Sequence, residues 1–105
     1  MAAYVLTINL EVEVDDLPLF RAAVSRHAEV TRQREDGCTY FDVCFGTDRR
    51  SRCLIYAIFE SGDALDHHLA SDHFNLFREL TVPWVISRID QVWELGFAPP
   101  HVGQS

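Results

Sequence analysis

The chain of 105 residues contains no lysine, so its nine basic side chains are all arginines. Schiff-base catalysis, pyridoxal-phosphate chemistry and the phosphate-binding P-loop all need an ε-amine. The absence of lysine therefore excludes these three chemistries. The sequence also has no GxGxxG, GxSxG or HExxH pattern, which removes the commonest signatures of dinucleotide binding, serine hydrolysis and zinc proteolysis.

Cysteine is scarce and unpaired in pattern. Cys38, Cys44 and Cys53 are odd in number and lack CxxC spacing, which indicates reduced thiols of an intracellular protein. The N-terminus has no basic segment before an apolar run, unlike a signal peptide. No stretch approaches the roughly 18 consecutive apolar residues of a membrane helix. We therefore expect a cytoplasmic protein that does not contact a membrane.

Positive charge is also in deficit, because the formal net charge is -7. An acidic chain without a basic run repels phosphate backbones, so nucleic acid is not an expected partner. Hydrophobic residues make up 48% of the chain, including seven Phe, three Tyr and two Trp. This is more aromatic surface than a small monomer easily buries, which favours a homodimer or a pocket for a small molecule.

Residue periodicity predicts a single domain spanning 1–105, with a core of about 4–97 and a loose tail over 98–105. Alternating apolar residues predict strands, and apolar repeats of three and four predict helices. The expected elements are strand 4–12, helix 18–35, strands 38–45 and 53–59, a helix broken into 62–70 and 72–81, and strand 91–97.

This order predicts an α+β fold, the ferredoxin-like βαββαβ antiparallel sheet with helices on one face. The second face of each strand is mixed rather than freely polar, with side chains such as Tyr40, Tyr56 and Trp93. Because helices on one side leave that face wet, we expect a second subunit to cover it. The homodimer is thus a prediction from the strand pattern.

Three histidines, His67, His68 and His73, lie close together in the broken helical segment. Imidazole is the side chain that titrates near neutral pH. His68 shares the face of Leu65 and should point toward the sheet, His73 should lie on or beside the inner face, and His67 should face water. We predict His68 and His73 as general base and general acid, with hydrogen-bonded structural histidines as the alternative. His27 is a weaker candidate.

A metal site is not expected, because adjacent histidines on a helix diverge and at most two of the three could reach one ion. Asn9 interrupts an apolar strand and could orient a ligand oxygen or form a structural hydrogen bond. Four aromatic side chains could either fill the core or line a slot for a flat ligand. They are Phe59, Phe74, Phe77 and Trp84.

Two runs, FRAAVSRHAEVTRQREDGCTYFDVC and IYAIFESGDALDHHLASDHF, resemble the antibiotic biosynthesis monooxygenase domain family. The resemblance covers about Tyr4 to Phe97 and implies dimers whose sheets pack into an α+β barrel. Family histidines map onto His68 and His73, and a first-strand asparagine maps onto Asn9. The chain departs from the family at Ala57, where many members carry Glu.

Three functions follow from the resemblance. The first is cofactor-independent oxygenation of a small aromatic, quinol or polyketide-like substrate, with His68 as base, Asn9 and Tyr40 steadying the anion, and no flavin or metal. The second is isomerisation of a small phosphorylated hydroxy-ketone, with Arg78 or Arg26 holding the phosphate. The third is a binding dimer without turnover, which Ala57 keeps open. Haem degradation is disfavoured, because His68 and Arg78 replace the Trp and the haem-ligating His of haem-degrading members.

Overall fold

The computed structural model describes residues 2–97, so the predicted tail over 98–105 lies outside the described residues. The elements in chain order are β1 (Tyr4–Val12), η1 (Val14–Asp16), α1 (Leu17–Arg34), β2 (Cys38–Phe45), β3 (Arg52–Phe59), α2 (Gly62–Leu69), α3 (Asp72–Thr81), η2 (Val82–Trp84) and β4 (Val85–Glu94). This order confirms the predicted α+β, ferredoxin-like arrangement.

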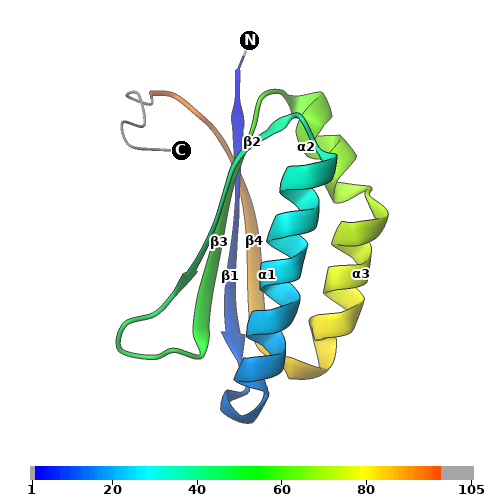
Figure 1. Cartoon of the computed structure of the whole chain (residues 1–105). Coiled ribbons are helices and arrows are strands. Elements are labelled where there is room, and N and C mark those ends of the chain that lie inside the picture. The colour runs from blue at the N-terminus through cyan, green and yellow to red at the C-terminus, as the bar shows by residue number, and fades with distance from the viewer. Residues whose placement is uncertain (1, 98–105) are drawn as a thin grey trace.

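The four strands form one antiparallel sheet in the order β2-β3-β1-β4. The three α-helices of the described residues lie together on one side of this sheet, and none of them lies on the other side (Figure 1). None of the helices among the described residues is both long and apolar enough to cross a lipid bilayer.

The core lies between the sheet and the helices. On β1 the residues Leu6, Ile8, Leu10 and Val12 are each at most 4% exposed, as their alternation predicts. From α1 the side chains of Phe20 and Val24 are fully buried against them. Each such apolar side chain contributes about 1.5–3 kcal/mol on burial, so this layer supplies much of the stability of the fold.

The last strand differs from the sequence-based expectation, because β4 begins at Val85 rather than at residue 91. β4 pairs with β1 along its whole length, from Val12 opposite Val85 to Tyr4 opposite Glu94. Residues 85–90 do not alternate cleanly, because β4 is an edge strand that in this sheet is mostly exposed on both faces. Tertiary pairing therefore extended a strand that local pattern alone did not predict.

A bulge near the start of β2 interrupts the alternation of side chains along this strand. Cys38 pairs with Phe59 and Tyr40 pairs with Ile58, so no residue of β3 lies opposite Thr39 in the strand pairing. Cys38 is consequently buried and Thr39 exposed, the reverse of simple alternation through this segment. From Tyr40 onward the predicted alternation of β2 is correct.

Gly37 lies at the tight connection between α1 and β2. A Cβ atom placed on it would lie 2.6 Å from Cβ of Ala64, in the first turn of α2. Real Cβ atoms do not approach so closely, so this position admits only glycine without a shift of the backbone. The absence of a side chain at Gly37 lets α2 pack against the end of α1, and that contact positions the site described next.

Candidate functional site

A polar group lies inside the apolar layer, beginning with a hydrogen bond between Glu35 and His68. Glu35 follows the last residue of α1 and His68 lies in α2, and their side chains are 3% and 1% exposed. Nδ1 of His68 lies 2.8 Å from Oε2 of Glu35. An ionised carboxylate only accepts hydrogen bonds, so Nδ1 of His68 is the protonated, donating nitrogen.

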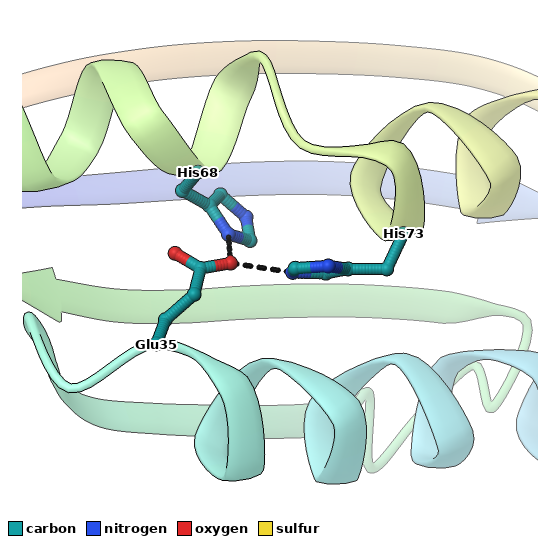
Figure 2. Close-up of side chains that lie close together, drawn as sticks. All are labelled: Glu35, His68 and His73. Carbon is teal, nitrogen blue, oxygen red and sulfur yellow. Dashed lines mark hydrogen bonds and ion pairs between the residues drawn. The ribbon is translucent and has the colours of Figure 1, made fainter.

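His73 completes the group from the first turn of α3. Its Nε2 atom is hydrogen-bonded to the same Oε2 atom of Glu35. Figure 2 shows this single oxygen lying between the two imidazole rings, which come from different helices. The side chain of His73 is 13% exposed and is the most accessible of the three. We refer to Glu35, His68 and His73 as the triad.

The break between α2 and α3 brings the two histidines of the triad together. In one continuous helix, residues five apart would point about 140° away from each other. Here Ser71 turns the chain: its hydroxyl donates to the carbonyl of His68 at 2.7 Å and accepts from the backbone N–H of Phe74 at 3.2 Å. Ser71 is therefore the N-cap of α3 and is also hydrogen-bonded to the end of α2.

Aromatic rings enclose His68. The centroids of Phe59 and Phe74 each lie 4.9 Å from the centroid of the His68 ring, and Phe41 lies 6.4 Å away. Burial among these rings lowers the pKa of His68, and the hydrogen bond and charge of Glu35 oppose that shift. Since burial is the larger effect, the ring is held in its neutral form.

His27 lies beside the triad on the buried face of α1. Its ring stacks on Phe77 at 4.5 Å, and its centroid lies 5.6 Å from that of His68 and 5.8 Å from that of His73. Burial, with smaller effects of the neighbouring histidines and of Arg88, lowers the pKa of His27 to about 3. His27 is therefore neutral at physiological pH.

Two buried polar atoms near the triad have no hydrogen-bond partner among the described residues. They are Nδ1 of His27 and Oγ1 of Thr31. Both residues belong to the buried stripe of α1, and Thr31 lies one helical turn before Glu35. Buried polar atoms are normally satisfied, so each of these two could bond to a polar group that the described residues do not supply.

Surface hollows reach the triad at two places. A hollow of about 90 Å³ between α1 and α3 is lined by Ala23, Arg26, His27, Val30, His73, Leu76, Phe77 and Leu80. A more open one of about 310 Å³ is lined at the end of α1 by Glu35, Gly37, Glu60 and His67, among others. The first is smaller than the roughly 300 Å³ that a drug-sized ligand fills. A larger substrate would thus have to displace exposed side chains such as Leu76 and Leu80.

The predicted aromatic residues separate into two groups. Phe59, Phe74 and Phe77 pack around the histidines. Trp84 lies in η2, where its carbonyl accepts from Glu13 just before the start of α1, so it is at the opposite end of that helix from the triad.

Asn9 and Tyr40 lie on the far face of the sheet from the triad. Asn9 pairs with Leu54 and Ile89, between the inward-facing Ile8 and Leu10, and its side chain is exposed. Tyr40 shares this outer face. The idea that both residues steady an anion held against His68 therefore fails within one chain, because the sheet lies between them. Alternation along β1 already placed Asn9 opposite the core.

The sequence interpretation missed Glu35, which it treated only as the end of the first helix. One signal was present, since the buried stripe of α1 contains Phe20, Val24, His27 and Thr31 at steps of three and four. The next step of four reaches Glu35. An acid at a helix C-terminus is also unfavourable to the helix dipole, which is a reason to look for a partner.

The sequence profile of the antibiotic biosynthesis monooxygenase family matches residues 3–80 of the chain. This range includes all three members of the triad. A comparison with curated proteins finds no match.

Solved structures with the same fold come from several organisms. A protein of Nitrosomonas europaea, provisionally named an antibiotic biosynthesis monooxygenase, is 22% identical with a TM-score of 0.84, covering 92% of both chains. A Caulobacter crescentus protein with the same provisional name is 16% identical with a TM-score of 0.86, covering 91% of this chain and 92% of that one. Rv0793 of Mycobacterium tuberculosis is 21% identical with a TM-score of 0.78, covering 97% and 99%. At these identities the likeness shows the fold alone.

Proposed function

The chain belongs to the antibiotic biosynthesis monooxygenase family, and from this premise we propose that it is a cofactor-independent monooxygenase of a small aromatic, quinol or polyketide-like substrate. His68 and His73 are the proposed proton-transfer groups, joined and oriented by Glu35. The observation that carries the proposal is the triad itself, two imidazoles on one buried carboxylate oxygen within an aromatic shell.

In the proposed reaction, His73 is the ring that meets the substrate, because it lines the hollow between α1 and α3. Its Nε2–H is bonded to Glu35, which leaves Nδ1 as the basic nitrogen. Nδ1 takes a proton from an acidic CH₂ or phenol of the substrate, and the carboxylate of Glu35 stabilises the imidazolium. His68 holds the carboxylate in place from the other side.

The substrate supplies the electrons. Its carbanion or enolate adds to dioxygen to give a hydroperoxide, and loss of water then leaves a carbonyl. The balance is CH₂ plus O₂ giving C=O plus H₂O, so neither a flavin nor an external reductant is required. The aromatic shell would keep bulk water from the anion before oxygen arrives.

Oxygen uptake with a panel of hydroxynaphthoquinols tests this proposal. We expect His73→Ala to lower the rate by roughly 10²–10⁴-fold, the usual contribution of a general base, and His68→Ala to lower it less. His67→Ala is the matched control, since His67 is an exposed neighbour whose ring is not hydrogen-bonded to Glu35. Full activity in His73→Ala would remove His73 from the mechanism.

One observation favours isomerisation as a second candidate. Arg26 lines the same hollow as His73 and His27, so a guanidinium could bind the phosphate of a small phosphorylated hydroxy-ketone beside the base. Exchange of the proton alpha to the carbonyl, followed by NMR in D₂O, would detect this activity. Arg26→Gln should then raise KM, and oxygen uptake should be absent.

We also propose that the protein acts as a homodimer with a small molecule as its other partner. The outer face of the sheet exposes Ile89 at 60% and Trp93 at 49% on β4, and Tyr56 and Leu54 lie on the same face of β3. A second copy that packs its sheet against this face would bury them. Asn9 and Tyr40 would then lie at the subunit interface.

A further inference from the structure

We propose that Glu35, His68 and His73 form a binding site for a divalent transition metal of the Zn²⁺ class. Oε2 of Glu35, Nδ1 of His68 and Nε2 of His73 would be the three protein ligands. The sequence argument against a metal considered the three helical histidines alone. Glu35, which lies 33 residues before His68, supplies the third donor that those histidines lack.

The donor atoms already converge. All three lie within 4.8 Å of one another. Ligands that share one Zn²⁺ at 2.0–2.2 Å lie roughly 3–3.5 Å apart. The 2.8 Å between Nδ1 of His68 and Oε2 of Glu35 is a few tenths of an ångström short of that range. An ion could therefore enter only if the three side chains move apart, most of all His73, whose contact with Oε2 is the shorter of the two.

The chemistry of the donors selects the metal. Without an ion, both imidazoles donate N–H groups to Glu35. Each ring can move that proton to its other nitrogen, which frees the lone pair for the metal without changing the charge of the ring. One carboxylate then offsets part of the dication. Two imidazoles and one carboxylate suit Zn²⁺, Co²⁺ or Fe²⁺, whereas Mg²⁺ and Ca²⁺ prefer oxygen donors.

The surroundings fit a site with an open coordination position. Three protein ligands leave a fourth position for water or a small ligand, as in catalytic rather than structural zinc sites. The unpartnered Nδ1 of His27 and Oγ1 of Thr31 are polar atoms in this region that could bond to such a ligand. His73 lines the hollow between α1 and α3, which provides a path for the ion.

Metal titration of the full-length, tag-free, chelator-treated chain tests the proposal. Co²⁺ would be followed by its visible absorption, and Zn²⁺ by calorimetry. We expect one ion per chain, with little response to Mg²⁺. Glu35→Gln and His73→Asn should each weaken metal binding by more than roughly 100-fold. Removing a residue that only hydrogen-bonds to a metal ligand typically weakens binding by roughly 10–100-fold, so a larger loss identifies a ligand. His67→Ala is the matched control and should bind like the wild type.

A second measurement does not depend on whether the variants fold. In ¹⁵N-labelled wild-type protein, Zn²⁺ should shift the Nδ1 resonance of His68 and the Nε2 resonance of His73 and leave those of His67 unchanged. Binding that persists unchanged in Glu35→Gln, or shifts confined to other histidines, or no binding at all, would overturn the proposal.

The metal site and the proposed oxygenase activity can fail separately. The inference depends on the geometry of the triad and not on the oxygenase reaction, and binding is measured without substrate. Oxygen uptake is measured on the chelator-treated protein. If both hold, Zn²⁺ should inhibit uptake by occupying the histidines that transfer protons.

Discussion

Glu35 has the largest role of any single residue in the interior polar group, because one of its oxygens accepts from two imidazoles. A buried donor left without an acceptor costs about 1–3 kcal/mol. Removal of this carboxylate would leave Nδ1–H of His68 enclosed by Phe59 and Phe74 with nothing to bond to. The triad is thus a stability element as well as a candidate site.

We predict that Glu35→Ala lowers the free energy of unfolding by about 2 kcal/mol or more. Glu35→Gln should cost less, since its amide oxygen can still accept one of the two hydrogen bonds. Urea unfolding in the presence of a chelator provides the measurement. Glu60→Ala, at an exposed position one residue beyond β3, is the control and should stay within about 0.5 kcal/mol of wild type. An unchanged midpoint for Glu35→Ala would show that the triad does not stabilise the fold.

The lowered pKa of His27 predicts that the free energy of unfolding depends on pH. Its pKa is about 3 in the folded protein, mainly through burial, against about 6.5 when unfolded. The unfolded chain therefore binds the extra proton between these values, so stability is complete above pH 6.5 and decreases as the pH falls toward 3. Between pH 7 and pH 5 this one group should remove about 2 kcal/mol.

His27→Phe isolates that contribution, because a phenyl ring can keep the stacking on Phe77 but cannot titrate. We expect the variant to lose about 2 kcal/mol less than wild type when the pH is lowered from 7 to 5. The pKa of His68 is lowered mainly by burial, and His27 is not among the causes of that shift, so we expect the effect of His68 to cancel largely in the comparison. Parallel pH profiles for the two proteins in urea unfolding would contradict the assignment.

At the scale of elements, the contacts between α1, α2 and α3 decide whether the triad forms. Ser71 binds the end of α2 to the start of α3, and Gly37 allows α2 to approach the end of α1. Both positions lie at element boundaries and make no contact with the reacting groups of the proposed mechanism. Their effect on the site is through the angle and spacing of the helices.

Gly37→Ala should destabilise the protein, because its Cβ would overlap Cβ of Ala64. Overpacking of this kind typically costs about 1–3 kcal/mol. Adding Ala64→Gly removes the opposing atom, so the double variant should be more stable than the sum of the two single changes predicts. Thermal and urea unfolding of the four proteins give this coupling. Gly96→Ala is the control, since nothing lies within 4 Å of its added Cβ.

For the whole molecule, the main feature is that the three α-helices of the described residues cover only one of the two faces of the sheet (Figure 1). The register of the strands places Ile89, Trp93 and Tyr56 on the other face. Antiparallel sheets can leave one face in water, but such faces are then usually polar. This face is mixed instead, and its exposed apolar side chains are the physical basis of the proposed dimer.

We predict a dimer mass for the wild type by light scattering at micromolar concentration. Ile89→Arg should shift the mass toward that of the 12.0 kDa monomer, because a charge would be buried without a partner. Leu76→Arg, an exposed position on α3 at the opposite side of the molecule, is the control and should remain dimeric. A monomeric wild type would remove the dimer proposal and leave the outer face unexplained.

The sequence by itself determined the class of fold, most element boundaries and the inward facing of His68. These depend on local periodicity and on capping residues such as Ser61 and Ser71, which act over three or four residues. The burial of His27 and the exposure of His67 follow from the same rule. The resemblance to the antibiotic biosynthesis monooxygenase family was confirmed by the match over residues 3–80.

Only the tertiary structure decided which side chain is hydrogen-bonded to His68. Its partner Glu35 lies 33 residues away in sequence, and their contact depends on how closely α2 packs at Gly37 and on how Ser71 turns the chain. The start of β4 at Val85 likewise depends on pairing with β1. Hydrogen bonds between distant segments are set by the relative placement of whole elements, and local periodicity contains no information on that placement.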